Sequence, residues 1–345
     1  MKITVIGEVN HGKTSLVESL LNKNLLKSRL EIKDLRTRDL QIQDFKINNH
    51  VYYLLDCPGH SSYLNNSILP IPYSDLIIIL FSAVQSTIPE KILSLLAYSK
   101  YQQKKILLVI TKADLATLEV FSKRASKITT LLKIANIEEY QYCIYSTNRP
   151  CLREKLLRKI EDIRLSLDTK KVNNNTLVLR SFNKTKTGSL VKQYQGGIIG
   201  CLASGELLED NYYYLNQKNN TSRIKIKKII NPSNTNNDFI TCQTSISGCY
   251  AASNNLKGAI ITKEPLLRNR TVVLTIDKYT TSNQTFTNVH LVTGFSMYKV
   301  VLKKTIKDTY HTTIPYLSQD TFLIMSKTQK IWNILAFGKI RECSC

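Results

Sequence analysis

The sequence has little of what marks membrane-spanning, secreted or disulfide-stabilised proteins. Its longest apolar run, Leu76 to Val84, is too short to cross a bilayer, and the N-terminus lacks the charged-then-apolar pattern of a secretion signal. The eight cysteines are scattered, without a CxxC pair or a histidine partner at zinc-ligand spacing. We therefore expect free thiols, residence in the cytoplasm and no membrane partner.

Acidic residues are also scarce. The chain has 26 Asp and Glu against 48 Lys and Arg, for a formal net charge of +22. Such an excess attracts polyanions, and RNA is the first candidate. Composition offers a second explanation, because a chain rich in Lys, Asn, Ile and Tyr with 12 glycines is also expected from A/T-rich codons. The net charge alone leaves both explanations open.

Apolar segments alternate with helical segments over the first half of the chain. This alternation is typical of a mostly parallel sheet with helices on both faces, and it predicts an α/β domain over residues 1–168. The strands are expected at 3–6, 51–55, 76–82, 106–110 and 140–145. The helices are expected at 14–21, 89–99, 119–134 and 152–163.

The second half has a different pattern. Residues 167–176 are polar and rich in Asn, which indicates a linker. Beyond them come short alternating strands such as 177–182 and 222–230, separated by Gly, Asn and Ser. This pattern predicts two all-β barrel domains, at 177–262 and 263–345, with their boundary near 263–269.

The segment "GEVNHGKTS" joins the first predicted strand to the first predicted helix and fits GxxxxGK[ST]. Glycines let the backbone curl so that its N–H groups face phosphate oxygens, and the helix N-terminus adds positive potential. Lys13 is expected to reach the β- and γ-phosphates, and the Thr14 hydroxyl to bind Mg²⁺. The nucleotide-binding residues predicted in this loop are Gly7, Val9, Asn10, His11, Gly12, Lys13, Thr14 and Ser15.

"DCPGH", residues 56–60, follows another predicted strand. The Asp56 carboxylate at the strand end is suited to hold Mg²⁺ through water, and the Gly59 N–H to meet the γ-phosphate. His60 follows directly and is a candidate for positioning the attacking water, although a lone histidine is often a bystander.

"TKAD", residues 111–114, closes a further apolar strand. The Asp114 carboxylate can accept two hydrogen bonds from guanine that adenine does not offer, while the stem of Lys112 covers the base. Thr111 belongs to the same motif, and the backbone at Ser146 and Thr147 is expected to meet the guanine O6. The alternative role of Asp114 is a helix N-cap.

These three motifs, in this order, resemble those of the translational GTPases, the family of elongation factor Tu. The resemblance implies an α/β P-loop GTPase domain followed by two β-barrels, with GTP or GDP and Mg²⁺ as ligands. The stretch "RSFNKTKTGSLVKQYQGGIIGCLASGELLEDNYYYL" (180–215) is similar to the start of domain 2 in the gamma subunit of translation initiation factor 2, and "LIMSKTQKIWNILAFGKI" (323–340) to its final strands.

Carried over by position, the resemblance assigns hydrolysis to His60 and places Val9 at an apolar position beside it. It also implies a Mg²⁺ ligand in the first switch loop. Thr37 has a similar spacing to Asp56 as in elongation factor Tu, but the usual Arg-Gly-Ile-Thr reads Asp-Leu-Arg-Thr here. Two further departures are Thr111, where Asn is usual, and Glu8, where His is common.

The resemblance therefore predicts a GTPase that binds methionyl initiator tRNA and delivers it to the small ribosomal subunit, with the alpha and beta subunits of initiation factor 2 as partners. Two alternatives remain open. Thr111 favours a selenocysteine-specific elongation factor, and the unusual first switch favours a scaffold that binds GTP and tRNA without hydrolysis.

Overall fold

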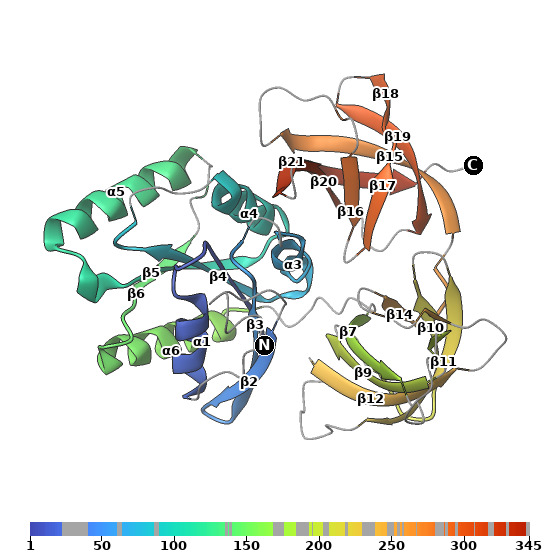
Figure 1. The fold of residues 1–345 in the computed structure, drawn as a ribbon, viewed down its shortest axis with the longest axis horizontal. Coiled ribbons are helices and arrows are strands. Elements are labelled where there is room, and N and C mark those ends of the chain that lie inside the picture. Colours follow the sequence, from blue (N-terminus) through green and yellow to red (C-terminus); the bar gives the residue numbers. More distant parts are fainter. Residues whose placement is uncertain are drawn as a thin grey trace. The chain divides into compact units, whose positions relative to one another are not determined.

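Figure 1 shows the helices and strands of the computed structural model, and the chain divides into two compact units. One comprises Met1–Thr169 with Lys327–Asn333, and the other Lys170–Ser326 with Ile334–Cys345. The structure describes residues 1–22, 41–60, 64–85, 90–134, 137, 140–167, 176–183, 193–194, 196–202, 207–217, 220–229, 239–246, 252–253, 256, 259–266, 268–279, 286, 289–293, 296–306, 308–316, 321–328 and 331–342. The predicted linker, apart from its two end residues, and Thr37 lie outside this set.

A six-stranded sheet forms the centre of the first unit, in the order β2-β3-β1-β4-β5-β6. All neighbouring strands are parallel except β2, which is antiparallel to β3. The strands are β1 (Lys2–Gly7), β2 (Gln41–Ile47), β3 (His50–Asp56), β4 (Leu76–Ser82), β5 (Lys105–Thr111) and β6 (Gln141–Ile144). The helices are α1 (Lys13–Leu21), α3 (Leu64–Ile68), α4 (Glu90–Tyr101), α5 (Leu118–Ile134) and α6 (Pro150–Leu165), with 3-10 turns η2 (Ile71–Tyr73) and η3 (Ala113–Leu115).

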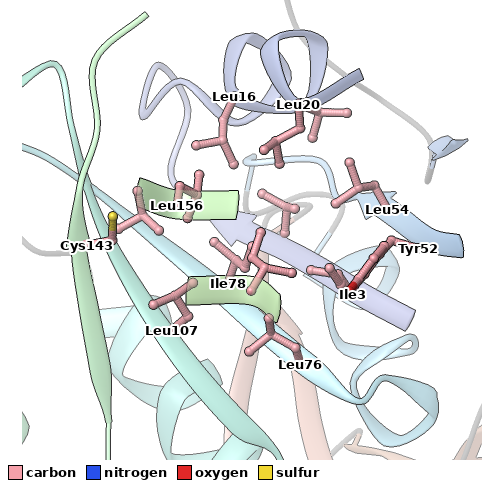
Figure 2. Close-up of a cluster of buried hydrophobic side chains, with 14 of the residues drawn as sticks. Ile3, Leu16, Leu20, Tyr52, Leu54, Leu76, Ile78, Leu107, Cys143 and Leu156 are labelled. Carbon is pink, nitrogen blue, oxygen red and sulfur yellow. The ribbon is translucent and has the colours of Figure 1, made fainter. Parts of the chain in front are cut away.

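Helices α1 and α6 pack on one face of this sheet. Figure 2 shows Leu16 of α1 and Leu156 of α6 beside Ile3, Ile78 and Leu107 of the strands, all of them buried. Every residue of β4 is buried, as expected for a central parallel strand covered on both faces. The apolar runs that predicted these strands are therefore the core of the unit, and the predicted fold class is confirmed.

The predicted strands and helices of this unit are all present, with ends that differ by a few residues. The helix predicted at 152–163 begins earlier, at Pro150, because proline suits the first turn, where no N–H partner is required. Strand β2 and helix α3 were not predicted. A two-residue turn joins β2 to β3, and both Asn48 and Asn49 have positive φ, which marks a hairpin turn that Asn tolerates.

The second unit contains a closed barrel with the strand order β10-β11-β12-β9-β7-β14. Along β11, the buried Ile224 and Ile226 alternate with the more exposed Arg223, Lys225 and Lys227, so the apolar side chains fill the barrel. Its strands are β7 (Thr176–Asn183), β9 (Gly196–Leu202), β10 (Tyr212–Asn216), β11 (Thr221–Ile229), β12 (Phe239–Ile246) and β14 (Ile260–Thr262). A two-stranded ribbon pairs β8 (Gln193–Tyr194) with β13 (Ala252–Ser253).

The same unit contains most of a seven-stranded antiparallel sheet in the order β17-β16-β20-β21-β15-β19-β18. Val272, Leu274 and Ile276 of β15 alternate into its core. The strands are β15 (Arg268–Tyr279), β16 (Val289–Thr293), β17 (Ser296–Val300), β18 (Lys303–Ile306), β19 (Thr309–Tyr316), β20 (Thr321–Thr328) and β21 (Ile331–Glu342).

The predicted domain ranges, 1–168, 177–262 and 263–345, stay predictions. No helix in the described part of the chain is both long enough and apolar enough to span a bilayer.

Candidate nucleotide-binding site

The predicted motifs follow the carboxyl ends of neighbouring parallel strands. The phosphate loop, Gly7–Thr14, runs from the last residue of β1 into the first turn of α1. The loop after β3 begins after Asp56, and those after β5 and β6 hold Lys112 to Asp114 and Ser146. The carboxyl ends of parallel strands meet at one edge of the sheet, where open α/β folds bind ligands. The fold therefore brings the motifs to one edge.

The loop between β1 and α1 curls through two residues with positive φ, Asn10 (63°) and Gly12 (82°). Gly12 adopts this conformation without the steric cost of a Cβ. Helix α1 begins at the next residue, and the described residues give it neither a side-chain N-cap nor an acidic residue in the first turn. Its N-terminal potential is therefore available to an anion.

Lys13 is the buried cation of this loop, with 6% of its surface exposed. Its Nζ donates a hydrogen bond to the Glu8 carbonyl at 2.8 Å. Burial lowers the pKa of Lys13, the charge of Asp56 opposes that shift, and the charge of Lys91 adds to it. The ammonium therefore lies in a poorly solvated place, where attraction to a phosphate is stronger than in water.

Thr14 and Asp56 meet across the site. The Thr14 hydroxyl donates to the buried Asp56 Oδ2 at 3.0 Å. A hydroxyl and a carboxylate fit Mg²⁺, which takes one or two protein oxygens and completes its shell with phosphate oxygens and water. Among the described residues, no cluster of three or more His, Cys, Asp or Glu side chains could hold a metal ion by itself. The donor set thus fits a metal shared with a phosphate ligand.

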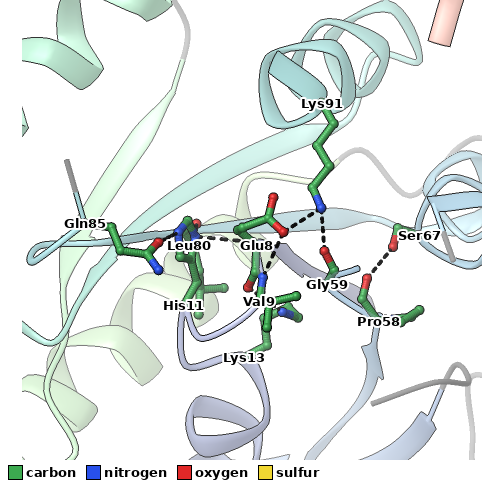
Figure 3. Close-up of polar contacts among 10 residues, drawn as sticks. All are labelled: Glu8, Val9, His11, Lys13, Pro58, Gly59, Ser67, Leu80, Gln85 and Lys91. Carbon is green, nitrogen blue, oxygen red and sulfur yellow. Dashed lines mark hydrogen bonds and ion pairs between the residues drawn. The ribbon is translucent and has the colours of Figure 1, made fainter. Parts of the chain in front are cut away.

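Gly59 lies directly against the phosphate loop. A Cβ added to it would be 2.8 Å from Val9 N and 2.9 Å from the Glu8 carbonyl carbon, so only glycine allows this approach. Pro58, the residue before Gly59, is held by the Ser67 hydroxyl, which donates to the Pro58 carbonyl at 2.9 Å (Figure 3). His60 follows and is half-buried. Its predicted role with water stays a prediction.

His11 has a structural environment that the motif did not indicate. Its side chain is fully buried, with Nδ1 2.8 Å from the Leu80 carbonyl and Nε2 hydrogen-bonded to Gln85 (Figure 3). Burial lowers the pKa of His11, whereas the hydrogen bonds to Leu80 and Gln85 oppose that shift. The imidazole therefore ties the phosphate loop to β4.

The motif predicted to read the base lies nearer the surface. The Asn148 amide donates to Asp114 Oδ2 at 2.8 Å, and the hydroxyl of the buried Ser146 accepts from the Asn148 N–H at 3.2 Å. Hydrogen bonding from Ser146 lowers the pKa of Asp114, with a smaller effect from Asn148. Lys112 adopts a positive φ of 56° just before η3. The carboxylate is thus held ionised and ready to accept.

Thr111, the last residue of β5, connects the motif at 111–114 to the phosphate loop, because its hydroxyl donates to the His11 carbonyl at 2.7 Å. Asn10, Ser15 and Thr147 are exposed, and Val9 is half-buried, so their contacts with a nucleotide stay predictions. Thr37 lies outside the described residues.

Sequence reasoning missed two functional candidates. Asn148 holds Asp114, and the only signal for it was its place beside Ser146 and Thr147. Lys91 of α4 forms an ion pair with Glu8, with 2.7 Å between Nζ and Oε1. The two residues are far apart in the sequence, and no motif joins them.

The model of the family described as "Elongation factor Tu GTP binding domain" matches residues 1–308. The chain belongs to this family. Its members are translational GTPases, which bind GTP or GDP with Mg²⁺ and hydrolyse GTP.

Curated relatives match part of the chain. It is 30% identical over 128 residues to the apicoplast elongation factor Tu of Plasmodium falciparum, covering 33% of this chain and 31% of that protein. It is 27% identical over 112 residues to translation initiation factor IF-2 of Latilactobacillus sakei, covering 32% and 12%. The matches thus span less than half the length of these relatives.

Solved structures share the fold over nearly the whole chain. Elongation factor SelB from Methanococcus maripaludis, in complex with the GTP analogue GppNHp, has a TM-score of 0.79 at 18% identity, covering 99% of this chain and 79% of that one. The GTPase-like domain of Ski7 from S. cerevisiae, bound to GTP, has a TM-score of 0.74 at 13% identity, covering 100% and 97%.

Proposed function

We propose that the chain is a cytoplasmic GTP-operated switch that hydrolyses GTP and carries methionyl initiator tRNA to the small ribosomal subunit, as the gamma subunit of initiation factor 2 does. The observation that carries the switch is the contact between the phosphate loop and the end of β3, where Thr14 bonds Asp56 and Gly59 lies against the loop, at the sheet edge that also bears Asp114. Family membership supports GTP hydrolysis.

In this proposal each residue has a defined task. Lys13 would bind the β- and γ-phosphates, and Thr14 and Asp56 would hold Mg²⁺, which would neutralise charge on the phosphates. His60 orients the attacking water, and Asp114 accepts from the guanine ring. Gly59 lies against the phosphate loop, so loss of the γ-phosphate releases the loop after β3.

The initiator tRNA is supported by the similarity of 180–215 and 323–340 to the gamma subunit and by the net charge of +22. The alpha and beta subunits of initiation factor 2 are the partners that this identity implies. The phosphate-loop geometry does not depend on either.

Hydrolysis is tested by single-turnover GTP cleavage with purified protein and ribosomes. We expect His60→Ala to lower the rate by at least about 100-fold while GTP affinity is kept, because the residue acts on water and not on the nucleotide. Equal rates would remove His60 from the mechanism. Binding of GTP without cleavage in the wild type would support the non-hydrolysing scaffold.

The tRNA is tested by competition between initiator, elongator and selenocysteinyl tRNA in the presence of GTP or GDP. We expect preference for initiator tRNA with GTP. A selenocysteine-specific factor is the second candidate, because Thr111 holds the His11 carbonyl where Asn is usual and because solved structures of such factors share the fold. Preference for selenocysteinyl tRNA would select it.

A further inference from the structure

Glu8 of the phosphate loop forms an ion pair with Lys91 of α4, and this pair has no part in the roles proposed above. Lys91 Nζ lies 2.7 Å from Glu8 Oε1, with 13% of the Lys91 side chain and 21% of the Glu8 side chain exposed (Figure 3). Partly buried charges are screened less by salt than surface charges. The charges of Lys91 and Glu8 therefore contribute to the binding free energy of a charged ligand placed next to them.

Glu8 accepts hydrogen bonds from two donors, the Val9 N–H and Lys13 Nζ, that could otherwise bind a phosphate. Its carboxylate accepts from the Val9 N–H at 3.1 Å, and its carbonyl accepts from Lys13 Nζ at 2.8 Å. A carboxylate in this position repels phosphate unless its charge is neutralised. Lys91 is the cation that the structure places on it.

Lys91 also holds the second loop of the site. Its Nζ donates to the Gly59 carbonyl at 2.5 Å. A Cβ added to that glycine would be 2.5 Å from Lys13 Nζ. Through its bonds to Glu8 Oε1 and to the Gly59 carbonyl, the Lys91 ammonium connects helix α4, the phosphate loop and the loop after β3. Lys91 is thus linked to the backbone segment expected to meet the γ-phosphate.

We propose that Lys91 is a specificity-determining residue for the third phosphate: it neutralises Glu8 and fixes Gly59, and so sets the preference for GTP over GDP. The inference rests on the proposed GTP binding. Loss of Lys91 leaves the Glu8 charge next to the end of GTP that carries the extra phosphate. GDP, which ends one phosphate earlier, feels this charge less.

The test is a double-mutant cycle read by titration with fluorescent GTP and GDP analogues in Mg²⁺. We expect Lys91→Met to weaken GTP binding by about tenfold and GDP binding by less than about threefold. Glu8→Gln keeps a carbonyl for the Val9 N–H but removes the charge, and it should strengthen GTP binding by about threefold. The double variant should return to within about threefold of the wild type, and Lys91→Arg should retain the preference.

A matched control is available on α5. Lys123 and Glu119 form an ion pair of 2.6 Å, and each side chain is 76% exposed. Lys123→Met removes the same charge from the protein and should leave the ratio of GTP to GDP affinity unchanged.

The outcomes separate the inference from the function beneath it. If the wild type binds neither nucleotide, the proposed function fails. If the wild type binds both and Lys91→Met weakens them equally, or Glu8→Gln does not restore GTP binding to Lys91→Met, the inference is overturned. Should Lys91→Met not fold, as judged by circular dichroism, Glu8→Gln alone decides: an unchanged GTP to GDP ratio overturns the inference.

Discussion

The two ends of the nucleotide site hold charge in opposite ways. At the phosphate end, Lys13 is 6% exposed and Asp56 fully buried, and burial lowers the pKa of Lys13. At the base end, Asp114 is half-buried, and hydrogen bonding lowers its pKa. Burial thus works against the charge at one end, while hydrogen bonds stabilise it at the other. In the proposed roles, burial would strengthen the attraction of Lys13 to phosphate at the expense of stability, whereas Asp114 would select guanine without that cost.

The largest expected effect comes from removing the buried cation. Lys13→Met should weaken both GTP and GDP binding by about 100-fold or more, because charge-assisted hydrogen bonds to two phosphates are lost. The free energy of unfolding without nucleotide should not fall, because the cost of burying the Lys13 charge outweighs the attraction of that charge to Asp56. Nucleotide titration and urea unfolding measure the two quantities. Lys133→Met, on the exposed face of α5, is the control.

The base end should respond in selectivity alone. The amide of Asp114→Asn places an N–H donor where guanine requires an acceptor. The variant therefore suits xanthine, which has a carbonyl where guanine has an amino group. We expect the preference for guanosine over xanthosine triphosphate to shift by about 100-fold toward xanthosine. The free energy of unfolding should change by less than about 0.5 kcal/mol, since the residue is outside the core. Competition between the two triphosphates measures the shift, and an unchanged preference would contradict the assignment of Asp114.

A smaller effect on nucleotide binding is expected at Gly59, where the backbone after β3 lies against the phosphate loop. Gly59→Ala adds a Cβ that would lie 2.8 Å from Val9 N, so the loop after β3 must move away. GTP binding should weaken by about tenfold and GDP binding by less, because this loop is expected to meet only the third phosphate. Titration with both nucleotides measures the ratio of GTP to GDP affinity. An equal loss of affinity for both would show that Gly59 supports the whole phosphate loop and not only the site of the third phosphate.

The same contrast explains what the sequence could predict. Buried strands such as β4 were predicted with correct ends, because an apolar run of this length, buried on both faces, has few alternatives. The Gly12 turn and the positions of Asp56 and Asp114 followed from glycines and strand-end carboxylates. These features are local in the chain.

What was missed depends on contacts between distant segments or on weaker local signals. The Glu8–Lys91 pair requires the register of α4 over the phosphate loop, and no pattern in either segment fixes it. The β2–β3 hairpin had a signal in Asn48-Asn49, but without glycine such a pair is also common in loops. The surroundings of His11 likewise come from Leu80 and Gln85 on another strand and its following loop.

The smallest expected effect tests burial at the phosphate end through pH. Burial lowers the pKa of His11 in the folded protein, whereas the unfolded chain keeps about 6.5. Between these two values the unfolded state binds more protons, so stability is full above the unfolded pKa and falls as the pH drops toward the folded one, by at most about 1.4 kcal/mol per pH unit. Urea unfolding should therefore show the wild type losing more stability than His11→Gln between about pH 7.5 and about pH 5.5. Parallel losses would mean that the imidazole is solvated, and the buried link between the phosphate loop and β4 would have to be abandoned.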